Sequence, residues 1–78
     1  MKPITLMVED KPILFNFKPV AVISSLSMGW IWELHFDTND FIYKLECSND
    51  FSTPAECEKH LDLFCEKNKI IINKKEWL

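Results

Sequence analysis

The chain has 78 residues, with nine basic and twelve acidic residues, a formal net charge of −3 and an apolar fraction of 47%. This length corresponds to one domain, so residues 1–78 are treated as a single domain. The basic residues are scattered and form no stripe that would neutralise phosphates, which argues against nucleic acid as a partner. No stretch approaches the roughly 20 apolar residues of a membrane span, so we expect no membrane association.

Three cysteines, Cys47, Cys57 and Cys65, are an odd number without the spacing of a disulfide framework. This pattern is typical of free thiols in a reducing compartment. The first residues also lack the apolar run of a signal peptide. We therefore expect a cytoplasmic protein whose cysteines pack in the core.

The first third of the chain predicts several short strands. The runs at 4–8 and 13–17 are separated by a polar turn and predict a hairpin. The run at 20–26 is rich in β-branched residues and does not alternate, which favours a strand covered on both faces over a short helix. Gly29 marks a turn after it. With the next hairpin, these segments predict a meander of up to four strands.

The stretch 30–47 predicts a β-hairpin with one apolar face and a three-residue turn at 38–40. The apolar face consists of Trp30, Trp32, Leu34 and Phe36 on the first strand and Phe41, Tyr43, Leu45 and Cys47 on the second. Pairing these sets gives a continuous aromatic slab and fixes the register. The opposite face is half apolar and half charged, and is either solvated or used in binding. It carries Ile31, Glu33, His35, Ile42, Lys44 and Glu46.

A helix is predicted from Pro54 to about Lys67, because Thr53 is a suitable N-cap and Glu56 follows it by three residues. Its apolar stripe consists of Cys57, Leu61, Phe64 and Cys65, and an acidic line consists of Glu58, Asp62 and Glu66. After the helix, 70–72 predicts a last short strand and 73–76 a polar turn or tail. Trp77 is expected to cover the core or to contact a second chain.

The helix also carries the residues that come nearest to a chemical site. Cys57 and His60 form the only thiol–imidazole pair at helical spacing, but no exposed, electropositive setting for a thiolate is apparent. A zinc ion needs four ligands, and Cys65 lies about 12 Å from Cys57 along the helix axis at ~1.5 Å per residue. We therefore predict no enzyme activity, no cofactor and no metal. Cys57 and Cys65 are expected to be buried, and His60 is expected to lie on the surface.

The predicted architecture is a small α+β domain, in which one helix packs on one face of a small antiparallel sheet of four to five strands. We expect a non-enzymatic protein that acts by association with another protein or with a second copy of itself. The half-apolar sheet face and the exposed strand edges favour association. The candidate partner-binding residues are Ile31, His35, Ile42, Lys44 and Trp77.

Two alternatives remain open. The first is an acidic inhibitor or nucleic-acid mimic, of the kind that phages and mobile elements encode, acting through Glu58, Asp62 and Glu66. The second is a single-strand nucleic-acid binder that stacks bases on the sheet aromatics, which include Trp32 and Tyr43.

Overall fold

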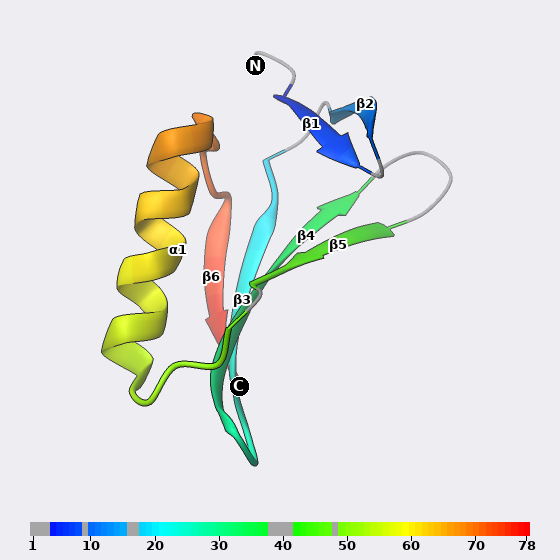
Figure 1. Cartoon of the computed structure of the whole chain (residues 1–78). Helices are drawn as coiled ribbons and strands as arrows, with labels where there is room; N and C mark the ends of the chain where they lie inside the picture. Colours follow the sequence, from blue (N-terminus) through cyan, green and yellow to red (C-terminus); the bar gives the residue numbers. More distant parts are fainter. Residues whose placement is uncertain (1–3, 9, 16–17, 38–41, 48) are drawn as a thin grey trace.

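The computed structural model describes residues 4–8, 10–15, 18–37, 42–47 and 49–78. In chain order its elements are β1 (Ile4–Val8), β2 (Lys11–Phe15), β3 (Val20–Leu26), β4 (Gly29–Asp37), β5 (Ile42–Glu46), α1 (Pro54–Asn68) and β6 (Lys74–Trp77) (Figure 1). The helix packs on one face of the larger sheet. The predicted α+β class is therefore confirmed.

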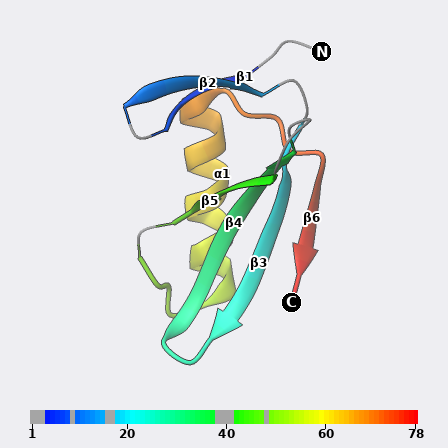
Figure 2. The same ribbon diagram turned by 90° about the vertical axis from the view of Figure 1, so that its right-hand side faces the viewer.

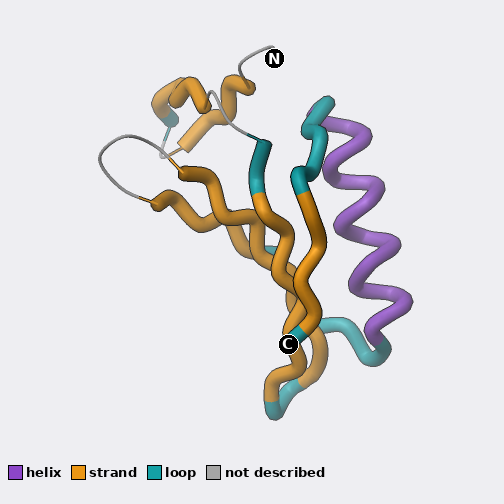
Figure 3. Tube along the Cα trace, turned by 180° about the vertical axis from the view of Figure 1, so that it is seen from behind, coloured by secondary structure: helices purple, strands orange, loops and turns teal. Residues whose placement is uncertain are grey.

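The larger sheet has four strands in the order β5-β4-β3-β6. β3, β4 and β5 form an antiparallel meander, and β6 pairs with β3 in parallel. The helix makes the crossover between β5 at one edge and β6 at the other, because parallel strands need a long connection. Figure 2 shows the four strands with the helix behind them. Figure 3 shows the two layers side by side, from the side opposite to Figure 1. The sheet is thus mixed, with one parallel pair.

The predicted first hairpin forms, but it does not extend the meander. β1 and β2 pair only with each other, as a separate two-stranded sheet. Both edges of β3 are occupied, by β4 and by β6, so no edge of β3 is left for β2. The prediction of a meander starting at the first strand is therefore wrong in this respect.

The central hairpin has the predicted register. Leu34 is opposite Leu45 and Phe36 is opposite Tyr43, so the two apolar sets share one face. Trp32, which lies on this face, is only 1% exposed. The predicted turn at 38–40 and Phe41 lie outside the described residues.

The helix begins as predicted, because the Thr53 side chain accepts a hydrogen bond from the Glu56 amide at 3.2 Å. Its buried residues pack against apolar side chains of β3 and β4 in one core. This core includes Cys57, Leu61 and Cys65 from the helix and Ala21, Ile23, Trp32, Leu34 and Phe36 from the sheet. Cys57 and Cys65 therefore pack in the core, as expected, and the half-buried Cys47 packs against it.

The last strand is Lys74–Trp77, so the prediction of a strand at 70–72 and of a polar turn at 73–76 is wrong. Lys69 ends the helix in the left-handed region, and the Ile70 amide donates to the Cys65 carbonyl at 2.8 Å. Ile70 is 6% exposed and belongs to the core. The isoleucines therefore lie at the end of the helix and in the connection to β6. Pairing with β3 begins after Asn73, whose amide donates a hydrogen bond to the Pro19 carbonyl.

The strand at 20–26 forms as predicted, but a second layer covers only one of its faces in the described part of the chain. β3 lies between β4 and β6, and α1 packs on the face that carries Ala21 and Ile23. On the other face, Val22 is only 4% exposed, although no described helix or strand lies over it. Its neighbours in the register are Glu33 and Glu76.

Candidate functional site: the open face of the sheet

The sheet face opposite the helix is the largest candidate surface. Side chains alternate between the two faces of a strand, and Trp32, Leu34 and Phe36 point to the helix. Their neighbours therefore point to the other side, which we call the open face (Figure 2). The open face carries Val20, Val22, Ile31, Glu33, His35, Ile42, Lys44, Glu46, Lys74 and Glu76.

The charges of the open face are ordered in two rows that run across all four strands. The basic row consists of Lys44, His35, Val20 and Lys74, which are successive neighbours in the strand register. The acidic row consists of Glu46, Glu33, Val22 and Glu76. The rows are two residues apart, about 7 Å along the strands. Each row has a valine on β3.

Ion pairs along the strands connect the two rows. His35 Nε2 lies 3.2 Å from Glu33 Oε1 on β4, and Lys74 Nζ lies 3.1 Å from Glu76 Oε1 on β6. The His35 pair carries full opposite charges only when the imidazole is protonated. Across the strands, by contrast, Glu33 lies directly opposite Glu46. Like charges in this position destabilise a sheet.

The structure brings together four of the predicted partner-binding residues. Ile31, His35, Ile42 and Lys44 all lie on the open face, and Ile42 is 60% exposed. Trp77 does not join them, because it alternates with Glu76 on β6 and points to the helix side of the sheet. Trp77 is 50% exposed.

A lysine of β6 forms ion pairs with two of the three residues in the predicted acidic line of the helix. Lys75 Nζ lies 2.9 Å from both Glu58 Oε2 and Asp62 Oδ1. Burial alone would lower the pKa of Lys75, but hydrogen bonds to the two carboxylates and their charges raise it overall. Two members of the acidic line therefore hold α1 to β6, and the third, Glu66, is exposed.

His60 is not the surface residue that the sequence suggested. Its Nδ1 accepts a hydrogen bond from the indole Nε1 of Trp32 at 3.0 Å. Its ring also stacks on Trp32, with centroids 5.9 Å apart, and contacts Phe51 at 4.9 Å. His60 is half-buried between these two aromatic rings, and it helps to fix the helix to the sheet.

The cysteines of the helix have the properties of packed side chains. Burial raises the pKa of both Cys57 and Cys65 to about 11, so both are neutral thiols near pH 7. In the described part of the chain, no three His, Cys, Asp or Glu side chains are grouped to hold a metal ion. No helix in that part is long and apolar enough to cross a membrane.

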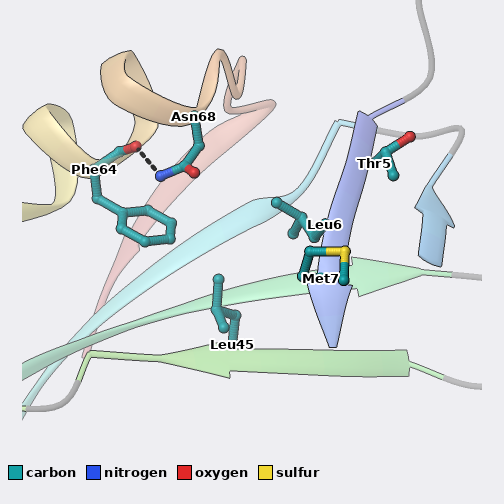
Figure 4. A pocket seen from close by; sticks show the side chains of 6 residues that line it. All are labelled: Thr5, Leu6, Met7, Leu45, Phe64 and Asn68. Atoms are coloured by element: carbon teal, nitrogen blue, oxygen red, sulfur yellow. Dashed lines mark hydrogen bonds between the residues drawn. The ribbon is translucent and has the colours of Figure 1, made fainter. Parts of the chain in front are cut away.

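A cavity of about 390 Å³ lies between the first hairpin, β5 and the C-terminal half of the helix (Figure 4). Its lining is mostly apolar and consists of Thr5, Leu6, Met7, Leu45, Phe64 and Asn68. The Asn68 amide is directed to the Phe64 carbonyl, with which it forms a hydrogen bond of 2.9 Å. The cavity lies on the helix side of the sheet and does not reach the open face.

Sequence reasoning missed four residues of the open face and the whole cavity. Val20, Val22, Lys74 and Glu76 join the open face only because β3 pairs with both β4 and β6. The alternation of Lys74 and Glu76 with Lys75 and Trp77 was the one available signal for the last strand. No local pattern indicates the cavity, which depends on where the first hairpin packs.

Comparisons with protein-family models, with curated proteins and with solved structures found no match to this chain.

Proposed function

We propose that this protein is a non-enzymatic cytoplasmic protein that works by binding another protein molecule through the open face. The observation that carries the proposal is that α1 covers one face of a four-stranded sheet, while no described element covers the other. That second face combines apolar side chains such as Ile31 and Ile42 with ordered charges. Protein interfaces commonly have this mixed character, with apolar contacts among polar groups.

Three observations favour this function over the alternatives. Trp32 is covered by the helix and bonded to His60, so it offers no free ring for stacking a base. Glu58 and Asp62 are bonded to Lys75, which reduces the negative charge available to an acidic mimic. The buried, neutral thiol of Cys57 is a poor nucleophile.

The cytoplasmic location is supported by a separate observation. The three cysteines are free, as in proteins of a reducing compartment.

The test replaces two apolar side chains of the open face, the exposed Ile42 and the half-buried Ile31. We expect Ile31→Ala combined with Ile42→Ala to weaken binding to any protein partner, whether a second copy or a different protein, by about tenfold. Tenfold corresponds to about 1.4 kcal/mol, which is the contribution of only about two buried methylene groups at ~0.8 kcal/mol each. Sedimentation velocity measures self-association, and affinity capture from extracts of the source organism measures other partners.

Leu63→Ala is the matched control, because Leu63 is an exposed leucine on the helix and lies on the other side of the molecule. We expect it to leave binding unchanged. If the control and the Ile31/Ile42 variant bind alike, the open face is not the binding surface.

A further inference from the structure

The charge order of the open face is unfavourable for an isolated sheet. Glu33 lies opposite Glu46, and His35 lies opposite Lys44. Exchanging Lys44 and Glu46 would place a lysine beside Glu33, so the observed order is the less stable of the two for this pair of strands. Glu33 has an ion pair with His35 on its own strand, but among the described residues no ion pair offsets the charge of Glu46. A local rule broken in this way is a common mark of a functional surface.

The two rows are complementary to each other when one face is turned over. A two-fold axis that runs across the strands, midway between the rows, places the basic row of one molecule over the acidic row of a second. The match holds strand by strand, because Lys44 and Glu46, His35 and Glu33, and Lys74 and Glu76 are each two residues apart on one strand.

The other two-fold arrangement is excluded by the same charges. An axis parallel to the strands would place the acidic row on the acidic row and the basic row on the basic row. Like-charge contacts of this kind cost free energy at an interface. The face is therefore complementary to itself in one orientation only, with the strands of the two molecules antiparallel.

We infer that the partner of the open face is a second copy of this chain, bound face to face with antiparallel strands. This inference rests on the proposed function and names the partner for the same surface. Each acidic row receives the basic row of the other copy, and this offsets the repulsion between Glu33 and Glu46. The contact is isologous, as in most two-fold dimers.

The size of the face determines the strength of the association. Four strands at about 4.8 Å and about six residues at about 3.3 Å give a face of about 20 by 20 Å. Two such faces bury on the order of 1,000 Å², which is at the low end for specific interfaces. We therefore expect a reversible dimer with a dissociation constant in the micromolar range. Salt weakens it, because the rim charges are exposed.

The test exchanges the charges of each row at the exposed edge strands. An acidic variant carries Lys44→Glu and Lys74→Glu, and a basic variant carries Glu46→Lys and Glu76→Lys. All four side chains are exposed, so the fold is retained. Each variant alone should self-associate at least about tenfold more weakly than the wild-type chain in sedimentation equilibrium at low salt. An equimolar mixture of the two should form a heterodimer at wild-type strength.

Two controls separate row order from total charge and from misfolding. Lys59→Glu with Lys67→Glu changes the net charge as much as the acidic variant does, but on exposed helix positions, and should retain most of the self-association. The chain with all four row substitutions should form dimers with itself, which a misfolded protein would not do. It should not pair with the wild-type chain in the antiparallel arrangement, because its reversed rows would then meet like charges.

Each outcome decides between the inference and the proposed function. Failure of the mixed variants to pair, with an undiminished wild-type dimer, overturns the antiparallel contact. A wild-type chain that stays monomeric at 1 mM, roughly a thousand times a 1 μM dissociation constant, overturns self-association altogether. In either case, capture of a different protein that depends on Ile31 and Ile42 would leave the proposed function standing. If capture of other proteins does not depend on Ile31 and Ile42 either, both the inference and the proposed function are wrong.

Discussion

The indole Nε1 of Trp32 donates a hydrogen bond of 3.0 Å to Nδ1 of His60, and this bond joins the centre of the sheet to the middle of the helix. Indole nitrogen only donates, so Nδ1 of His60 must accept. His60 is therefore the neutral tautomer with its proton on Nε2. The pair satisfies the one polar atom of a side chain that is otherwise buried in the core.

Replacing His60 with Phe should test this bond. His60→Phe keeps an aromatic ring against Phe51 but leaves the Trp32 N–H without an acceptor, which should lower the free energy of unfolding by about 1–3 kcal/mol. Urea denaturation measures the change. In a Trp32→Phe background, which lacks the donor, the same replacement should cost clearly less. Equal costs in the two backgrounds would mean that the hydrogen bond contributes nothing to stability.

The buried thiols predict a loss of stability at high pH. Burial raises the pKa of Cys57 and Cys65 from the ordinary value of 9.0 to about 11, with a smaller contribution from Cys47 to the first and from Asp62 to the second. The unfolded thiols ionise near pH 9 while the folded ones keep their protons, so unfolding is favoured as the pH rises from about 9 to about 11. The decrease reaches at most about 1.4 kcal/mol per pH unit for each thiol.

Denaturation curves at several pH values between 8 and 11 test whether ionisation of the two thiols lowers the free energy of unfolding. The control is Cys57→Ala combined with Cys65→Ala, which is less stable at every pH but lacks both ionising groups. Its free energy of unfolding should fall less steeply above pH 9 than that of the wild-type chain. Parallel curves for the two proteins would contradict the prediction.

The elements that the sequence predicts well are those with a strong local pattern. Period-two alternation around Trp32 and Leu45 determines the register of the central hairpin, because a shift by one residue would expose the apolar set. Thr53, Pro54 and Glu56 determine the start of the helix in the same local way. Alternation also groups Ile31 with the other candidate residues on one face.

The elements that the sequence predicts poorly depend on distant parts of the chain. The isoleucines at 70–72 have high β-propensity, but the helix end places Ile70 in the core before the chain can reach β3. Lys74–Trp77 has a weak strand composition and pairs only because the crossover brings it beside β3. The rows of the open face depend on this pairing, so no local pattern could have revealed them.

Lys75 should contribute more to stability than its neighbour Lys74. Lys75→Met removes the cation that holds Glu58 and Asp62 together, and we expect it to cost about 0.5–1.5 kcal/mol. Lys74→Met is the matched control on the opposite face of the same strand, where only the exposed pair with Glu76 is lost, and should cost less than about 0.5 kcal/mol. Urea denaturation at low and high salt compares them. Equal costs would show that the bridge to the helix adds nothing.

Gly29 should tolerate no side chain, although it directly follows the exposed turn at Ser27 and Met28. Its φ is +144°, and a Cβ at this position would lie 2.7 Å from the backbone oxygen of Phe51. That oxygen accepts from the Trp30 amide at 2.8 Å, and the Phe51 amide donates back to Trp30 at the same distance. Gly29→Ala therefore has to disturb both bonds as well as strain the backbone, and should cost about 1–3 kcal/mol in urea denaturation. Ser27→Ala in the same turn should be nearly neutral, and faster hydrogen exchange at the Trp30 and Phe51 amides should accompany the glycine replacement alone.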